Sequence, residues 1–328
     1  MVKNITYLLG AGASYKAYPI LSEQGEKMIE LVQIFKKLKE NGSFKGNESF
    51  KDLERIFDDM EHFGKKAKEF GTIDTYARKL FLNDNRELEK LKVAVSLFFT
   101  IWQLTDDKEL KTFEKRQALE IDSRYISLLA TILEKKDDNI VMKENINFVT
   151  WNYDLQLEYA FRKFDNKIKV KNLLNTSPLK ICHLNGYHGF YGTSKEENDF
   201  LGRTASKKIE DIINEIGFIS ESYKKGTINI NNYINYAWEE ESKIALNTRE
   251  EAKKIFKQTD ILIIIGYSFP NFNKDIDKNL FQELGQQIEV YYQNPNPTKE
   301  FISQLINIEN EKIHLVNKLD YFYLPYSF

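Results

Sequence analysis

Six short apolar runs constrain the fold of this 328-residue chain more than any other feature of its sequence. They lie at 5–9, 146–150, 181–184, 261–265, 288–292 and 313–316. Several are almost entirely apolar, such as Ile-Leu-Ile-Ile-Ile at 261–265, which is typical of strands that helices cover on both faces of a parallel sheet. We therefore predict an α/β fold, with a Rossmann-like parallel sheet of about six strands flanked by helices.

A long helical segment separates the first two of these runs. It far exceeds the dozen or so residues that a single crossover needs, and helical periodicity dominates it, for example at 23–38, 50–63 and 122–134. A second stretch, rich in Lys, Glu and Ile, follows the third run. We therefore predict one domain over 1–328 that carries an inserted helical subdomain, with insertions at about 22–140 and 195–250.

Charge and cysteine content narrow the possible functions. The chain has 47 Lys and Arg residues against 49 Asp and Glu residues, so no overall basic field attracts nucleic acid, and we expect no direct binding to it. Cys182 is the only cysteine, so one chain can form neither a disulfide nor a cysteine zinc cluster, which suits a reducing compartment. The apolar run at 93–104 is shorter than the ~20 residues that cross a bilayer, and the first residues do not read as a signal peptide. We expect a cytoplasmic protein with no metal and no membrane segment, in which 93–104 is a buried helix.

A glycine turn follows the first run, in the sequence GAGAS at 10–14. A strand, a glycine turn and a helix in that order bring backbone N–H groups close to a pyrophosphate, so we interpret Gly10, Ala11, Gly12 and Ser14 as nucleotide-binding. A plain tight turn is the alternative. The dinucleotide signature G-x-G-x-x-G is incomplete because Tyr15 occupies its sixth position, which disfavours a hydride-transferring dehydrogenase.

The second run ends in the sequence TWNYD, which contains Thr150, Asn152 and Asp154. A parallel strand delivers its carboxyl end into the ligand crevice of such a fold. The amide of Asn152 can both donate and accept, which suits holding a ribose hydroxyl, or a water beneath an anomeric carbon. Asn152 or Asp154 could instead cap the helix that begins near Leu155, and the position of Asp154 favours this alternative.

Two of the four histidines lie in and after the third run, in KICHLNGYHGFYG at 180–192. Side chains alternate along a strand, so we expect His183 and Asn185 to share one face, with His188 beyond Gly186 in the following loop. A histidine near its unperturbed pKa can accept a proton from a ribose hydroxyl or a water at neutral pH. Either histidine could instead be structural.

The later strand ends and the C-terminus carry weaker signals. Gly266 and Ser268 follow the fourth run in the sequence GYSF, and Asn294 follows the fifth. We expect these residues to contact the adenosine side of a dinucleotide. The aromatic sequence YFYLPYSF at 321–328 is expected to pack against the core, or else to dock on a neighbour.

Together these motifs resemble the sirtuin-like family. The matching elements are the family's G-A-G-x-S at 10–14, its T-x-N-Y-D at 150–154, its L-H-G element at 181–186 and its G-Y-S-F at 265–269. The resemblance implies an NAD pocket, contacted also by Thr150, Asp154 and Asn185, in which Asn152 and a histidine help to cleave the nicotinamide–ribose bond. The family's His-Gly is Asn185-Gly186 here, so the base could be His183 or His188, and we prefer His183.

The absence of a cysteine cluster separates this chain from the protein-deacylating sirtuins, whose zinc module needs four cysteines. The helical insertions in its place resemble those of bacterial sirtuin-like effectors of antiphage defence, which destroy NAD. The resemblance therefore implies an NAD glycohydrolase that takes NAD as substrate, needs no metal, and releases nicotinamide and ADP-ribose. It also implies a homo-oligomer or a regulatory partner protein. The alternative, favoured by Asn185, is a non-catalytic sensor that binds NAD or ADP-ribose and acts through a partner protein.

Overall fold

The computed structural model describes residues 2–45, 49–174, 181–191, 208–216, 231–239, 243–306 and 308–326. The chain divides into two compact units. The first comprises Met1–Ser14, Ile121–Gly186 and Asn235–Phe328, and the second comprises Tyr15–Glu120 and Tyr187–Ile234. Much of the insertion predicted at 195–250 lies outside the described residues, and the domain boundaries proposed from the sequence stay predictions.

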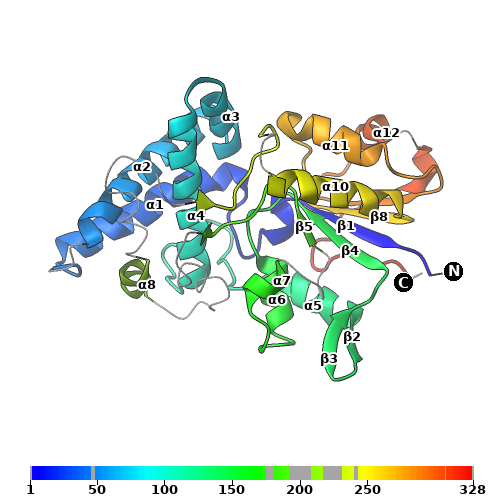
Figure 1. The fold of residues 1–328 in the computed structure, drawn as a ribbon, viewed down its shortest axis with the longest axis horizontal. Helices are drawn as coiled ribbons and strands as arrows, with labels where there is room; N and C mark the ends of the chain where they lie inside the picture. The colour runs from blue at the N-terminus through cyan, green and yellow to red at the C-terminus, as the bar shows by residue number, and fades with distance from the viewer. Residues whose placement is uncertain are drawn as a thin grey trace. The chain divides into compact units, whose positions relative to one another are not determined.

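A six-stranded parallel sheet forms the centre of the first unit (Figure 1). Its order is β10-β9-β8-β1-β4-β5, and every neighbouring pair is parallel. The strands are β1 (Ile5–Leu9), β4 (Ile146–Thr150), β5 (Ile181–His183), β8 (Ile261–Ile265), β9 (Glu289–Gln293) and β10 (Ile313–Val316). The predicted α/β fold is therefore confirmed, with the third strand ending one residue early and the fifth shifted by one residue.

β1 lies where the strand order reverses. The chain passes from β1 to β4 and β5 on one side of the sheet, whereas β8, β9 and β10 continue on the other side. In open α/β sheets, ligands bind in the crevice outside the carboxyl ends of the strands at such a switch point. The fold therefore brings the segments after β1, β4 and β8 to the place where a site is expected.

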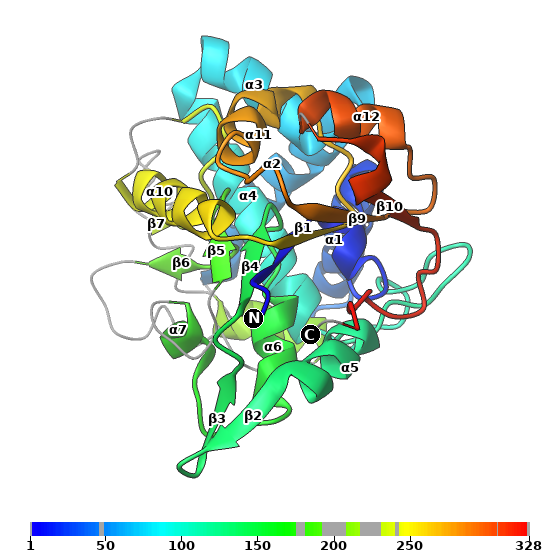
Figure 2. The same ribbon diagram turned by 90° about the vertical axis from the view of Figure 1, so that its right-hand side faces the viewer.

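Helices cover both faces of the sheet (Figure 1 and Figure 2). One face carries α10 (Lys243–Lys257), α11 (Lys274–Phe281) and α12 (Lys299–Leu305), and the other carries α5 (Ser123–Ile132) and α6 (Gln156–Arg162). On the first face, Leu8 and Ile264 from the sheet pack with Phe256 and Leu280 from the helices. All five residues of β1 and of β8 are buried, which is why these runs are apolar, since burial stabilises by roughly 25 cal/mol per Å² of apolar surface. The short elements of this unit are η1 (Ala11–Ser14), α7 (Val170–Leu173), η2 (Asn271–Asn273) and η3 (Asn310–Lys312).

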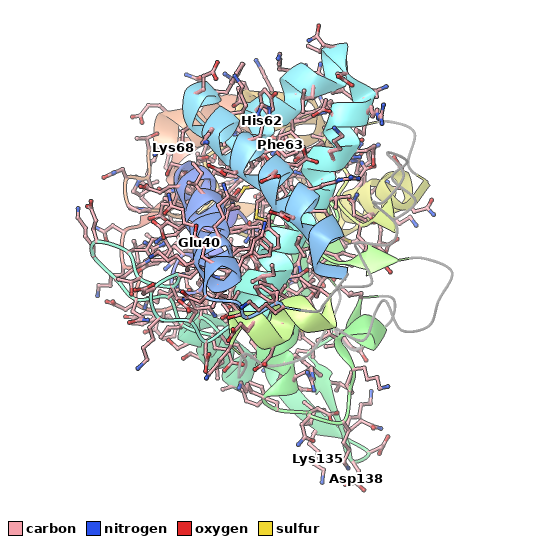
Figure 3. All side chains as sticks on the ribbon, turned by 90° about the vertical axis from the view of Figure 1, so that its left-hand side faces the viewer. Glu40, His62, Phe63, Lys68, Lys135 and Asp138 are labelled. Carbon is pink, nitrogen blue, oxygen red and sulfur yellow. The ribbon has the colours of Figure 1, made fainter. Side chains whose placement is uncertain are left out.

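A β-hairpin replaces the end of the helix predicted at 122–134. α5 ends at Ile132, and β2 (Leu133–Lys136) pairs antiparallel with β3 (Asn139–Met142). Asp137 and Asp138 form its turn with φ of 49° and 65°, a left-handed conformation that Asp tolerates better than most residues. The hairpin projects from the unit, with the exposed side chains of Lys135 and Asp138 at its tip (Figure 3).

Helices dominate the described part of the second unit. They are α1 (Leu21–Glu40), α2 (Ser49–Phe70), α3 (Ile73–Asn83), α4 (Asn85–Leu104) and α8 (Ile209–Glu215). In the same unit β6 (Phe190–Tyr191) pairs antiparallel with β7 (Asn231–Asn232). α1 and α2 approach closely at Gly25 and Gly64, where a Cβ on Gly25 would lie 2.8 Å from the Gly64 carbonyl oxygen. Every residue of α4 from 93 to 104 is buried, as predicted. In the part of the chain that the structure describes, no helix is long and apolar enough to span a membrane.

Candidate active site

The glycine turn after β1 packs against the turn after β8. The Gly10 N–H donates to the Ile265 carbonyl oxygen over 3.0 Å, and the Gly12 N–H donates to that of Gly266 over 2.9 Å. Gly266 has a φ of +60°, and a Cβ there would lie 2.3 Å from the Ala13 nitrogen, so side chains would prevent this approach. The Ala13 N–H is bonded as well, to the Gly10 carbonyl oxygen. These glycines therefore shape the turn, and three of its N–H groups are already used within the protein.

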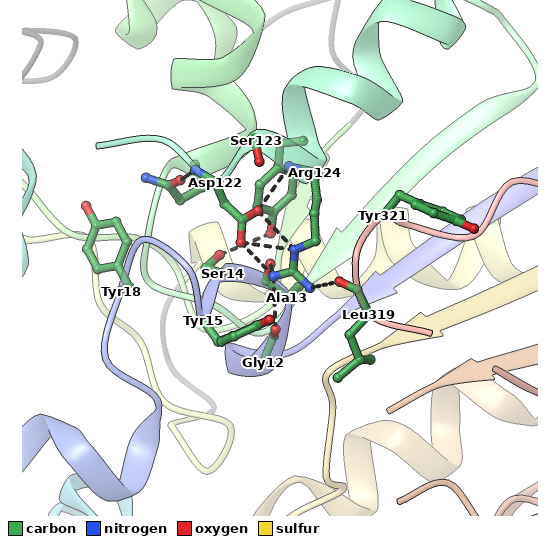
Figure 4. Close-up of polar contacts among 12 residues, drawn as sticks. Gly12, Ala13, Ser14, Tyr15, Tyr18, Asp122, Ser123, Arg124, Leu319 and Tyr321 are labelled. Atoms are coloured by element: carbon green, nitrogen blue, oxygen red, sulfur yellow. Dashed lines mark hydrogen bonds and ion pairs between the residues drawn. The ribbon is translucent and has the colours of Figure 1, made fainter. Parts of the chain in front are cut away.

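Arg124 fixes the carbonyl side of the same turn (Figure 4). Its Nη2 donates to the Ala13 oxygen over 2.7 Å, and its guanidinium forms an ion pair with Asp122, with both side chains buried. Asp122 also accepts from the Arg124 backbone N–H at the start of α5. Sequence reasoning missed Arg124, because an Asp-Ser-Arg sequence at a helix start indicates a cap and says nothing about a distant turn.

Ser14, Asn152 and Asp154 meet in one buried hydrogen-bond network. The Ser14 Oγ donates to Asp154 Oδ1 over 3.0 Å and accepts from Asn152 Nδ2 over 3.4 Å. The Tyr125 hydroxyl lies 3.1 Å from Ser14 Oγ. Because the single hydroxyl proton of Ser14 already points to Asp154, the Tyr125 hydroxyl is the donor in this pair. Thr150 supports the network by accepting the Asn152 backbone N–H on its Oγ1. The structure thus brings together four of the residues singled out in the sequence.

Asp154 also binds the start of α6. Its Oδ1 accepts the Gln156 backbone N–H over 3.1 Å, so the capping alternative and the network contact hold together. Burial raises the pKa of Asp154 to about 6, although the hydrogen bonds from Gln156 and Ser14 lower it. The carboxyl group is therefore ionised above about pH 6, within the range in which a general base works at neutral pH.

His183 lies beside this network but is paired with a buried carboxylate. Its Nε2 lies 2.7 Å from Glu158 Oε1, and its Nδ1 faces the Asn152 carbonyl oxygen at 3.5 Å. Burial alone would lower the pKa of His183, but the charge and hydrogen bond of Glu158 outweigh it and raise that pKa. An acceptor lies near each nitrogen, which favours the protonated imidazole and makes His183 less suited to accept a proton. The role of Glu158 could not be predicted from the sequence, because nothing in the first turn of a short helix indicates that this side chain faces β5.

Asn185 and His188 have separate environments. β5 ends at His183, so Asn185 lies in the following turn instead of on the strand face predicted for it. Its Oδ1 is buried without a hydrogen-bond partner among the described residues, while its backbone oxygen accepts the Asn235 N–H. His188 belongs to the second unit, where its Nδ1 lies 3.3 Å from the Thr100 hydroxyl and its ring stacks on Phe99.

The predicted adenosine contacts do not join the Ser14 network through any hydrogen bond of the described residues. Ser268 is exposed, and Asn294 is half-buried, with its N–H donating to the Val316 oxygen. Ala11 is also half-buried, in the glycine turn. Their contacts with a nucleotide stay predictions.

A second buried carboxylate, Asp277, lies on the face of the sheet that α11 covers. The Tyr267 hydroxyl donates to its Oδ2 over 2.7 Å and accepts from Asn273 Nδ2 over 3.0 Å. The Trp151 ring stacks on that of Tyr267, with centroids 6.0 Å apart. Burial raises the pKa of Asp277 to about 7, although the Tyr267 hydroxyl and the nearby Trp151 lower it. Within the described residues, no group of three or more His, Cys, Asp or Glu side chains could hold a metal ion.

Comparison with solved structures finds similar chains. No family model matches the chain, and no curated protein matches it. The chain is similar to a solved structure described as "Structural Basis for the Mechanism and Regulation of Sir2 Enzymes", with 13% sequence identity and a TM-score of 0.42. The match covers 97% of this chain and 88% of that chain. A likeness at this identity and TM-score carries no argument about chemistry, so the site is judged by its own residues.

Proposed function

We propose that this protein binds NAD outside the carboxyl ends of β1, β4 and β5 and hydrolyses the nicotinamide–ribose bond. The products are nicotinamide and ADP-ribose. The observation that carries the proposal is the buried network in which Ser14, Asn152 and Asp154, from two different strand ends, share hydrogen bonds. Such convergence at a switch point is the usual origin of a site in this fold class.

Asn152 is the residue that holds the sugar or the attacking water. Its bond to Ser14 uses the amide nitrogen, which leaves the amide oxygen for a ribose hydroxyl or a water. Its backbone is fixed at both ends, because Thr150 accepts the N–H and His183 faces the carbonyl oxygen. A side chain held in this way can position a reactant without reorganising during the reaction.

Asp154 replaces His183 as the proposed base. With a pKa of about 6, its carboxylate is ionised at neutral pH. It takes a proton from water as the water oxygen bonds to the anomeric carbon and the carbon–nitrogen bond to nicotinamide breaks. Its negative charge also favours the positive charge that develops on the sugar. His183 instead helps to hold the Asn152 peptide through its Nδ1.

The test is release of nicotinamide from NAD by the purified protein. We expect the wild type to release nicotinamide. Asn152→Ala should lower the rate of release about 100-fold or more, which is the size of effect seen when a preorganised polar contact is removed. Asn139→Ala, on the exposed hairpin, is the control and should match the wild type. A folded wild type that leaves NAD intact would exclude the hydrolase.

A non-catalytic NAD or ADP-ribose sensor is the second candidate. The observation in its favour is that the family's histidine position holds Asn185 and that the nearby His183 is already paired with Glu158. Calorimetry distinguishes the two, because a sensor binds NAD with measurable heat but releases no nicotinamide.

The sequence resemblance to bacterial antiphage effectors extends the proposal to the cell. There the protein would act in the cytoplasm, deplete NAD on infection, and be controlled through a homo-oligomer or a regulatory partner. Measuring NAD in bacteria that express the wild type or Asn152→Ala, with and without phage, tests this role. Depletion should require Asn152 and should increase with phage.

A further inference from the structure

Residues 318–323, which we call the C-terminal strap, are bonded to the central sheet of the first unit by the buried side chain of Gln293 on β9. Gln293 Nε2 donates to the carbonyl oxygens of Lys318 and Tyr321, over 2.6 and 2.7 Å, and its Oε1 accepts the Tyr323 N–H. The Tyr7 hydroxyl adds a bond to the Tyr323 carbonyl oxygen. The strap is therefore held at several backbone positions by two strands of the sheet.

Phe322 is the buried contact of the strap. Its ring lies edge-on to that of Tyr125, with centroids 4.8 Å apart, and the Arg124 guanidinium lies 4.8 Å from its centroid. Arg124 Nη1 also donates to the Leu319 carbonyl oxygen over 3.4 Å (Figure 4). Two consecutive residues of α5 thus rest on the strap.

The same two residues hold the glycine turn. Arg124 Nη2 donates to the Ala13 oxygen, and the Tyr125 hydroxyl lies on Ser14 Oγ. A continuous set of contacts therefore runs from Phe322 through α5 to Ser14, and from there to Asp154 and Asn152.

We propose that the C-terminal strap is a working part of the nucleotide site, with Phe322 as the positioning residue that sets Ala13 and Ser14 through Arg124 and Tyr125. The nucleotide is NAD, and this part of the proposal rests on the proposed function. Removing the ring leaves a void beside Tyr125 and takes away the aromatic face under Arg124. Any event that lifts the strap should then loosen the turn and weaken NAD binding.

Hydrogen–deuterium exchange tests the coupling without any ligand. The amides of Gly12 and Ala13 are hydrogen-bonded within the protein and should exchange slowly. We expect Phe322→Ala to speed their exchange about tenfold or more, because local opening becomes easier. Tyr321→Ala is the matched control, since that side chain is 56% exposed and the tie to Gln293 uses its backbone. Phe322→Leu keeps most of the buried volume and should show the same change if the alanine variant fails to fold.

Steady-state kinetics test the consequence for the site. Phe322→Ala and Phe322→Leu should raise the KM for NAD about tenfold because they loosen the turn, and kcat should change less, since Asn152 and Asp154 keep their bonds to Thr150 and Gln156. Unchanged amide exchange at Gly12 and Ala13 in a folded Phe322 variant would overturn the strap proposal. A wild type that neither binds nor cleaves NAD would overturn the proposed function and leave the exchange result to decide on the strap.

Discussion

Two buried carboxylates, Asp154 and Asp277, lie near the same end of one sheet but have different surroundings. Burial raises the pKa of both, to about 6 and about 7. Asp154 shares Ser14 with Asn152, next to the hydrogen-bonded pair of His183 and Glu158. Asp277 accepts from the Tyr267 hydroxyl, which also accepts from Asn273, and this small network lies beside the apolar layer that contains Trp151 and Tyr267.

Adjacent residues of one motif separate the two environments. Trp151 packs with Tyr267 on the α11 face, whereas Asn152 bonds to Ser14 at the end of β1. A raised pKa by itself therefore does not identify a site, because structural groups in a core have one too. The convergence of polar side chains from several strand ends distinguishes the Asp154 network.

Replacing each carboxyl group by an amide should distinguish the two aspartates most clearly by its effect on activity. Asp154→Asn removes the proposed base, so we expect nicotinamide release to fall about 100-fold or more, whereas Asp277→Asn should stay within about twofold of the wild type. In the wild type, kcat/KM should fall as the pH drops below about 6, because Asp154 becomes protonated. Equal losses in the two variants would refute the distinction.

The free energy of unfolding should depend on Asp277, although NAD cleavage should not. The pKa of Asp277 is raised from 3.8 to about 7 on folding, so the folded state binds more protons in that window and loses stability as the pH rises through it. Asp277→Asn removes this dependence. We expect it to stabilise the protein at pH 8 by on the order of 2 kcal/mol relative to the wild type, with no gain below pH 4. Urea unfolding at several pH values measures this, and a variant with the wild-type slope would contradict it.

Glu158→Gln probes the charged neighbour that only the Asp154 network has. Without the carboxylate, burial should dominate and lower the pKa of His183, so a neutral ring bonds the Asn152 carbonyl oxygen only in its Nδ1–H tautomer and holds that peptide less firmly. We expect nicotinamide release to fall about tenfold, with a lower His183 titration midpoint by NMR. The matched control is Glu289→Gln, because His314 and Glu289 form a similar pair, 2.6 Å apart, on the part-exposed β9 and β10. An equal effect of both variants would count against Glu158.

Tyr267→Phe should give the smallest effect. It removes the hydroxyl that donates to Asp277 and leaves that carboxyl group less satisfied, at a cost of about 1 kcal/mol in unfolding free energy. Because the change lies in the core network, NAD cleavage should stay as in the wild type. Loss of cleavage in a stable Tyr267→Phe protein would place Asp277 in the site after all.

The sequence predicted the framework better than the partners within it. Strands that are buried on both faces are mostly apolar, so β1 and β8 could be located to the residue, and Asn152 followed from its place at a strand end. Glu158 and Arg124 could not be predicted, because their roles depend on which distant groups the packing brings to them. The glycines of the turn were recognised, but their main reason, contact with Gly266, needed the register of β1 against β8.

The most direct test of the whole account is carboxyl-carbon NMR on aspartate-labelled protein, with and without ADP-ribose, which the enzyme does not cleave. The Asp154→Asn and Asp277→Asn variants assign the two signals. We expect ADP-ribose to move the Asp154 signal and its titration midpoint and to leave those of Asp277 in place. A shift at Asp277 with none at Asp154 would contradict the central claim that the Asp154 network is the nucleotide site.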